Sequence, residues 1–159
     1  MSATRRTTIQ TTGESMFHEA PKSWSACSSG DADGPGVASG TVFIVDDDAA
    51  VRDALSLLVY SWGWTPHACA SAEEFLECYS RERNACLVLD LQMPGISGAD
   101  LKEILVELDL DLPTIVITAH PDHAQAARAL RAGAVAVVPK PFRHDELLAV
   151  IERALATAH

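Results

Sequence analysis

The sequence predicts a doubly wound α/β fold over residues 41–158, with five parallel strands and five helices. Short apolar runs alternate along the chain with segments in which apolar residues recur at helical spacing. The runs are apolar throughout rather than at every second position, which is typical of parallel strands covered by helices on both faces. Right-handed crossovers between such strands give the doubly wound arrangement.

The expected strands are residues 41–45, 64–69, 86–91, 113–118 and 135–138. Pro66 cannot donate a hydrogen bond to a neighbouring strand, so the second strand is expected at an edge of the sheet. The expected helices are residues 49–62, a helix opened by the capping pair Ser71 and Glu74, a helix capped by Ser97, and residues 121–132 and 145–156. Gly63 is suited to end the first helix in a left-handed conformation.

Residues 1–40 differ in composition from the rest of the chain. They are rich in Ser, Thr, Gly and Ala, and they show neither helical nor strand periodicity. We therefore expect a disordered N-terminal tail that does not contribute to the fold. Met16 lies within this segment and is an alternative natural start to Met1.

Composition excludes several classes of function. The net charge of −10 argues against direct binding to nucleic acid, which requires a basic face. The chain contains no run of roughly 20 apolar residues for membrane insertion and no apolar signal region, so a cytoplasmic location is expected. The cysteines form no CxxC pair, which argues against zinc and favours free thiols. The histidines His67, His120, His123 and His144 are expected at the surface.

Polar side chains gather where the predicted strands end. Asp46, Asp47 and Asp48 follow the first strand, Asp90 lies at the end of the third, Thr118 ends the fourth, and Lys140 follows the fifth. In a doubly wound fold these carboxyl ends line the functional crevice. Clustered carboxylates repel one another unless a cation neutralises them, and oxygen ligands without His or Cys favour Mg²⁺. A metal-neutralised carboxylate beside a lysine and a hydroxyl is typical of a site that accepts a phosphoryl group.

Four motifs resemble the signature of bacterial response-regulator receiver domains. They are residues 45–47 (VDD), 89–95 (LDLQMPG), 118–119 (TA) and 140–142 (KPF), in the order and spacing of that family. Residues 41–53 and 132–142 are similar to its FixJ-like subgroup in particular. The resemblance covers about residues 41–158 and implies a CheY-like, flavodoxin-like fold with strand order 2-1-3-4-5.

The resemblance also implies a role for each motif residue. Asp90 would be the phosphoacceptor, Thr118 would donate its hydroxyl to the phosphoryl group, and Lys140 would pair with that group. Mg²⁺ would be bound by Asp90, directly by Asp47, mainly through water by Asp46, and by the backbone carbonyl of Gln92. The bond between Lys140 and Pro141 corresponds to one that is cis in the family.

The implied protein is a phosphorylated switch rather than an enzyme acting on an external substrate. A sensor histidine kinase or histidine phosphotransfer protein would supply the phosphoryl group. A downstream protein would bind the surface formed by the fourth helix, fifth strand and fifth helix, and the chain would be a monomer or a phosphorylation-dependent homodimer. One departure is Val137, which occupies the position where the family usually has an aromatic residue that swings inward on activation.

Other interpretations remain open. Asp46 and Asp48 imitate the DxD motif of haloacid-dehalogenase-like phosphatases, although that interpretation leaves Asp90 unexplained. A flavodoxin-like cofactor binder is disfavoured because three carboxylates in the first loop would repel a phosphate. We expect Asp48 to act only as a helix cap. No helix-turn-helix follows Ala158, which predicts a stand-alone regulator, and the alternative is a receiver fragment of a longer DNA-binding transcription factor.

Overall fold

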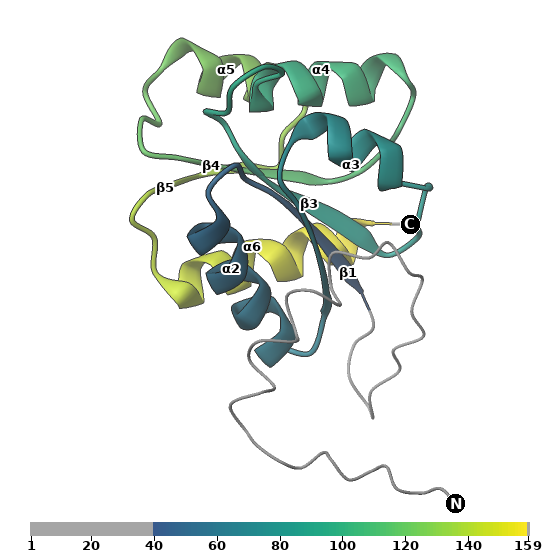
Figure 1. The fold of residues 1–159 in the computed structure, drawn as a ribbon, viewed down its shortest axis with the longest axis vertical. Coiled ribbons are helices and arrows are strands. Elements are labelled where there is room, and N and C mark those ends of the chain that lie inside the picture. Colours follow the sequence, from purple (N-terminus) through teal and green to yellow (C-terminus); the bar gives the residue numbers. More distant parts are fainter. Residues whose placement is uncertain (1–39, 159) are drawn as a thin grey trace, which may run out of the picture.

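A five-stranded parallel sheet forms the centre of the molecule. The computed structural model describes residues 40–158, and its strands have the order β2-β1-β3-β4-β5. The strands are β1 (Thr41–Val45), β2 (Thr65–Cys69), β3 (Ala85–Asp90), β4 (Thr114–Thr118) and β5 (Ala136–Pro139), as Figure 1 shows. All neighbouring strands are parallel. The predicted fold and strand order are therefore confirmed.

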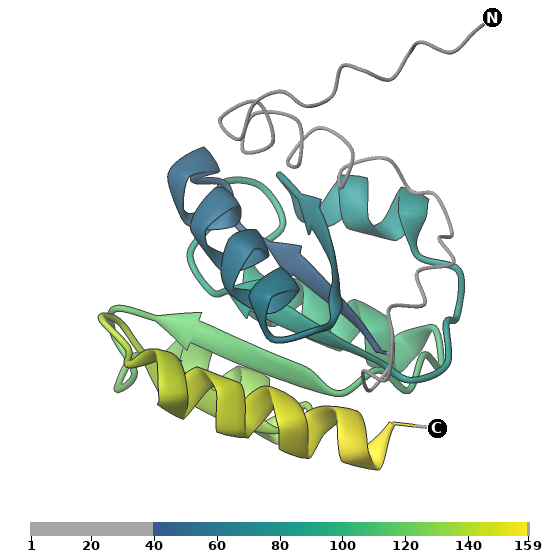
Figure 2. The ribbon, with the colours of Figure 1, turned by 90° about the horizontal axis from the view of Figure 1, so that it is seen from below.

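The helices cover both faces of the sheet. They are α2 (Ala49–Ser61), α3 (Ala72–Cys78), α4 (Gly98–Glu107), α5 (Ala124–Arg131) and α6 (His144–Thr157). Helices α2 and α6 lie on one face and α3, α4 and α5 on the other (Figures 1 and 2). This two-sided cover explains why the strands are apolar throughout, since both faces of each inner strand are buried.

The two faces of the sheet carry separate parts of the core. Val42 and Ile44 of β1 point towards α2 and α6, where Leu147 and Ile151 are fully buried. Phe43 packs on the opposite face, among the residues of α3 and α4. Every residue of β3, the central strand, is buried. Because β3 ends in Asp90, the core fixes the position of that carboxylate.

The helix ends agree with the sequence signals in most places. Asp48 caps α2, with its side chain accepting a hydrogen bond from the Ala50 N–H, and Ser97 caps α4. Ser71 accepts from the Glu74 N–H as predicted, but the Glu74 carboxylate accepts from the N–H of Ala70 rather than from Ser71. Gly63 follows α2 with a φ of 98°, the left-handed conformation expected of it.

Of the elements with predicted bounds, β1 matches at both ends, and α2, β2, β3, β4, β5 and α6 differ by one residue at one or both ends. The largest difference is in α5, which begins three residues later than predicted. Helix α5 begins at Ala124 rather than at residue 121. His123 caps it, because Nδ1 of its ring accepts a hydrogen bond from the Gln125 N–H, and residues 121–123 form a turn. Strand β5 begins and ends one residue later than expected. Strand β2 lies at a sheet edge, as Pro66 indicated.

The remaining predictions from composition have mixed outcomes. Cys69 and Cys86 are buried free thiols as expected, whereas Cys78 is disulfide-bonded, so the prediction of free thiols is wrong there. His120, His123 and His144 are exposed, but His67 is half-buried against the Phe43 ring, with 5.2 Å between ring centroids. Within residues 40–158, no helix has the length and apolar character needed to cross a membrane. Residues 1–39 of the predicted tail, which include Cys27, lie outside the described residues.

Candidate functional site

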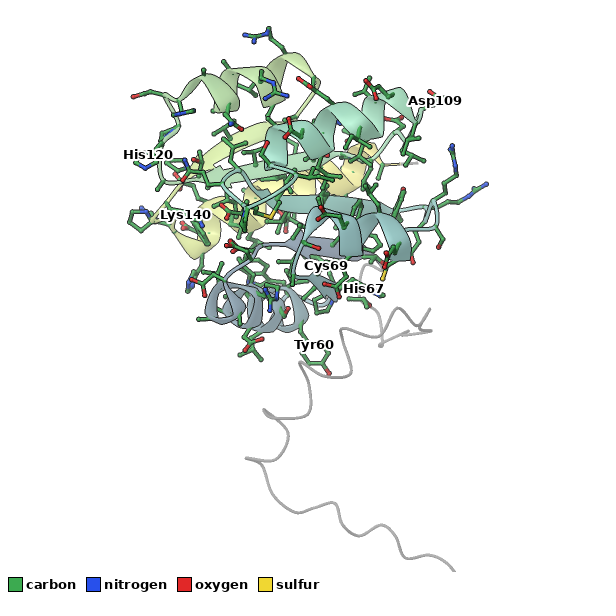
Figure 3. All side chains as sticks on the ribbon, turned by 45° about the horizontal axis from the view of Figure 1, so that its top comes forward. Tyr60, His67, Cys69, Asp109, His120 and Lys140 are labelled. Atoms are coloured by element: carbon green, nitrogen blue, oxygen red, sulfur yellow. The ribbon has the colours of Figure 1, made fainter. Side chains whose placement is uncertain are left out.

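The predicted polar residues meet at the edge of the sheet where its strands end. Asp90 is the last residue of β3 and lies opposite Ile117 of β4, one residue before Thr118. Lys140 follows β5, and its N–H donates to the Thr118 carbonyl at 2.8 Å. Figure 3 shows Lys140 and His120 on the same side of the molecule, away from Asp109. The parallel register therefore brings together residues that are far apart in the sequence.

Three carboxylates form an acidic cluster at this edge. Asp46, Asp47 and Asp90 each have one carboxylate oxygen within 4.8 Å of those of the other two. Asp46 and Asp90 are buried, with 3% and 7% of their surface exposed, whereas Asp47 is exposed. Such a set of oxygen donors, partly open to solvent, fits Mg²⁺, which binds few carboxylates and keeps several waters. They are the three carboxylates that the resemblance implied as metal ligands, alongside the backbone carbonyl of Gln92.

Lys140 lies beside the two buried carboxylates. Its ammonium group is 3.4 Å from Asp90 Oδ1 and 3.7 Å from Asp46 Oδ2. The Lys140–Pro141 peptide bond is cis, as the resemblance implied. A lysine in this position places a positive charge where transferred phosphoryl oxygens would need one.

The environment raises the pKa of both buried carboxyl groups. For Asp90, burial is the main cause and the negative charge of Asp46 adds to it, while Lys140 and a hydrogen bond from the Gln92 N–H oppose it. For Asp46, burial again dominates, opposed by the hydrogen bond from the Asp48 N–H and by Lys140. One lysine thus does not offset the burial of two carboxylates, and a bound cation would favour their ionised forms.

The loop after β1 has a defined structure. The Asp48 N–H donates to Asp46 Oδ1 at 2.8 Å, so it is the backbone of Asp48, and not its carboxylate, that contacts the acidic cluster. The Asp48 side chain caps α2 as predicted. Arg52 donates to the Asp46 carbonyl at 2.7 Å. Sequence reasoning missed Arg52, although its position one helical turn after the cap Asp48 could have indicated it.

Thr118 is fully buried at the end of β4. Its hydroxyl oxygen accepts a hydrogen bond from the His120 N–H at 3.0 Å. The hydroxyl proton is not used in that bond and remains available to an acceptor. Thr118 therefore links the acidic edge of the sheet to the loop that precedes α5.

The start of α4 lies directly against the backbone of Asp90. The Gly98 N–H donates to the Leu91 carbonyl at 3.0 Å, which closes the loop that contains Gln92. A Cβ atom on Gly98 would lie 2.6 Å from the Asp90 carbonyl oxygen and 2.8 Å from Leu91 Cα. Sequence reasoning also missed this glycine. The available signal was a glycine directly after the cap Ser97. Glycine is unfavourable within a helix, so its presence there indicates a close backbone contact.

Val137 is half-buried on β5, beside Val116 of β4. It packs against the small apolar cluster that contains Leu91, Ala126 and Ala129. The position where the resemblance implied an aromatic residue is thus occupied by a short side chain at the edge of a packed cluster.

The chain is similar in sequence to known response regulators. The response regulator receiver domain model matches residues 42–152. Response regulator protein TodT of Pseudomonas putida is 44% identical over 117 residues, covering 74% of this chain and 52% of TodT. Transcriptional regulatory protein FixJ of Rhizobium meliloti is 42% identical over 114 residues, covering 72% of this chain and 56% of FixJ. The chain spans about half the length of the curated relatives it matches.

Solved structures agree with these relatives. The crystal structure of FixJ-N is 41% identical and superposes with a TM-score of 0.70, covering 74% of this chain and 94% of that one. The structure of response regulator StyR is 44% identical, also with a TM-score of 0.70, covering 75% of this chain and 60% of that one. Because the family model matches well over half of the sequence, the chain belongs to the response regulator receiver domain family.

Proposed function

We propose that the chain is a phosphorylated switch of two-component signalling, with Asp90 as the phosphoacceptor. The observation that carries this proposal is the position of the buried Asp90 carboxylate beside Asp46, Asp47 and the Lys140 ammonium. Among residues 40–158, the partners that stabilise the ionised Asp90 carboxylate are Lys140 and the Gln92 N–H, and they do not offset the cost of its burial. Acceptance of a phosphoryl group gives it a chemical role.

The proposed reaction is a transfer from a phosphorylated histidine of a kinase or phosphotransfer protein. An oxygen of Asp90 attacks phosphorus, the bond between phosphorus and the imidazole nitrogen breaks, and that nitrogen keeps the electron pair. The product is an acyl phosphate on Asp90. Lys140 stabilises the negative charge on the transferred oxygens. Magnesium held by Asp46, Asp47, Asp90 and the Gln92 carbonyl would neutralise further charge at the same place.

The phosphatase alternative predicts a different acceptor. In that interpretation Asp46 and Asp48 would carry the chemistry, but the Asp48 carboxylate is exposed and is used to cap α2. Mapping of the phosphorylated residue distinguishes the two proposals. Phosphorylation of Asp46 or Asp48 would favour the phosphatase.

Incubation with acetyl phosphate and Mg²⁺ is expected to add the mass of one phosphoryl group to the intact protein. EDTA should prevent the gain, because the carboxylates then repel the donor. Peptide mapping should place the group on Asp90, and Asp90→Asn should show no gain. A mass gain in Asp90→Asn equal to that of the wild type would overturn the assignment.

The output of the switch is proposed to be protein binding at the surface formed by α5, β5 and α6. We propose no direct contact with nucleic acid, a cytoplasmic location, and either a monomer or a phosphorylation-dependent homodimer. The relatives are about twice as long as the matched region, and one is named a transcriptional regulatory protein. A receiver portion of a longer transcriptional regulator is therefore the second candidate.

Phosphorylation is expected to displace the loop after β4 rather than a ring on β5. Thr118 should turn its hydroxyl towards the phosphoryl oxygens, which disturbs the hydrogen bond from the His120 N–H. Amide chemical shifts with and without beryllofluoride should change from Asp90 through Thr118 into residues 119–132. Thr118→Ala should remove the changes beyond residue 118. Far changes that persist in Thr118→Ala would contradict this route, and unaltered partner binding by Val137→Tyr would show that position 137 does not gate output.

A further inference from the structure

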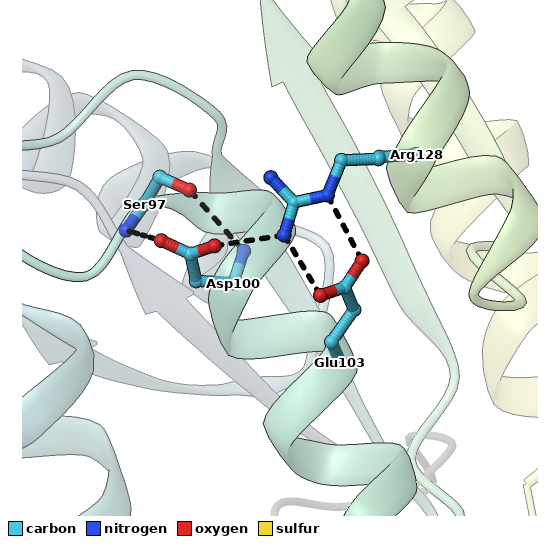
Figure 4. A network of polar contacts seen from close by, with 4 residues as sticks. All are labelled: Ser97, Asp100, Glu103 and Arg128. Atoms are coloured by element: carbon cyan, nitrogen blue, oxygen red, sulfur yellow. Dashed lines mark hydrogen bonds and ion pairs between the residues drawn. The ribbon is translucent and has the colours of Figure 1, made fainter.

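A network of charged groups joins the first turns of α4 to α5. Arg128 of α5 donates from Nη2 to Asp100 Oδ1 at 2.8 Å. It also binds both carboxylate oxygens of Glu103, at 2.9 Å from Nε and 2.7 Å from Nη2. Figure 4 shows the Arg128 guanidinium between the two carboxylates. Within residues 40–158, these are the ion pairs that connect the two helices.

Asp100 has a separate contact with each of its oxygens. Its Oδ2 accepts from the Ser97 N–H, while its own N–H donates to Ser97 Oγ, which together form the capping box of α4. Its Oδ1 is the oxygen that binds Arg128. The cap belongs to the loop that leaves Asp90, and Gly98 lies directly against the Asp90 backbone. Arg128 is therefore connected to the Asp90 backbone through the Asp100 side chain and the first turn of α4.

Few other interactions hold α5 in place. Its buried residues are Ala126 and Ala129, whose side chains contribute little apolar surface, and Leu130 is exposed. An ion pair therefore contributes a larger fraction of the free energy that holds this helix on the domain than it would in a helix with large buried apolar residues. Removal of that contact should consequently shift the position of α5.

We propose that Arg128 is a positioning residue that holds α5 against the start of α4 in the unphosphorylated protein. This inference rests on the proposed phosphorylation of Asp90. The loop from Thr118 to α5 moves when Asp90 is phosphorylated, and the contact of Arg128 with Asp100 and Glu103 opposes that movement. Phosphorylation and release of Arg128 then favour each other, because coupling between two sites is reciprocal.

The test compares Arg128→Gln and Glu103→Gln with Arg131→Gln. Arg131 lies on the same helix and has the same charge, but it makes no ion pair within the described residues. Without a phosphoryl mimic, the amide shifts of residues 119–132 in Arg128→Gln should move part of the way towards those of the beryllofluoride-bound wild type. Phosphorylation by acetyl phosphate should be about two- to five-fold faster, the range that a partly exposed ion pair can supply. Arg131→Gln should match the wild type in both measurements.

A double variant makes the test specific to the contact. Arg128→Gln with Glu103→Gln should change the rate no more than Arg128→Gln alone, since Arg128→Gln already removes the ion pair with Glu103. Arg128→Lys keeps the charge without the two-pronged geometry and should give an intermediate rate. Shifts that do not approach the beryllofluoride-bound positions, or an equal effect in Arg131→Gln, would overturn the proposal. A wild type that gains no phosphoryl mass would instead refute the proposed function.

Discussion

Asp47→Ala is expected to gain no detectable phosphoryl mass under conditions that fully phosphorylate the wild type. Asp47 is the exposed member of the acidic cluster, so its side chain is the one most accessible to an arriving ion. If Asp47 binds Mg²⁺ directly, as proposed, its loss should slow transfer by at least about 100-fold, because even the partners of metal ligands contribute 10- to 100-fold. Intact-mass time courses at several Mg²⁺ concentrations measure the effect. A higher Mg²⁺ concentration should restore part of the rate.

Asp48 provides the matched control for this prediction. It is the next residue, it is also an exposed aspartate, and its backbone rather than its side chain contacts Asp46. Asp48→Ala should therefore be phosphorylated at nearly the wild-type rate, although loss of the α2 cap lowers the free energy of unfolding by about 1 kcal/mol. Asp48→Asn retains a capping oxygen and should be normal in both respects. Equal loss of phosphorylation in the Asp47 and Asp48 variants would refute the distinction between the two residues.

The sequence was sufficient to predict which polar residues share one edge of the sheet. That edge follows from the parallel order of apolar strands. Strands β3 and β4 end in Asp90 and Thr118, and β1 and β5 are followed directly by Asp46 and Lys140, whereas β2 contributes no charged or hydroxyl residue at its end. Asp90 is the clearest case, because the five residues before it are all buried in the core. The roles of Asp46 and Asp47 came from the family resemblance, since the order of three adjacent aspartates does not itself show which of them contacts an ion.

Contacts between distant elements could not be predicted in this way. The position of Arg128 depends on how α4 and α5 pack, and α5 has a short alanine-rich face that specifies little about its neighbour. The start of α5 was likewise misplaced because residues 121–123 lack a signal that separates a turn from a first helical turn. His67 was expected at the surface, but the aromatic cluster around Phe43 gives its ring a partner.

Gly98→Ala is expected to damage both the stability of the domain and the phosphorylation of Asp90. The added methyl group would lie 2.6 Å from the Asp90 carbonyl oxygen and 2.8 Å from Leu91 Cα, and neither backbone atom can move without moving β3 or its loop. Overpacking of this kind costs about 1–3 kcal/mol, which corresponds to a fall in Tm of about 4–12 °C in a domain of this size. The relief of the clash displaces the start of α4, together with the loop that carries Gln92.

Gly40→Ala serves as the control for Gly98→Ala, because its added Cβ would meet mainly the flexible end of Leu155, at 3.1 Å. This variant should lose less stability and should be phosphorylated at the wild-type rate. Thermal unfolding measures the loss of stability. Intact-mass time courses recorded well below the melting temperature of the weaker variant measure phosphorylation of the folded protein, so the two effects are separated. If folded Gly98→Ala were phosphorylated as fast as Gly40→Ala, then the contact between α4 and the Asp90 backbone would stabilise the fold without positioning the phosphoacceptor.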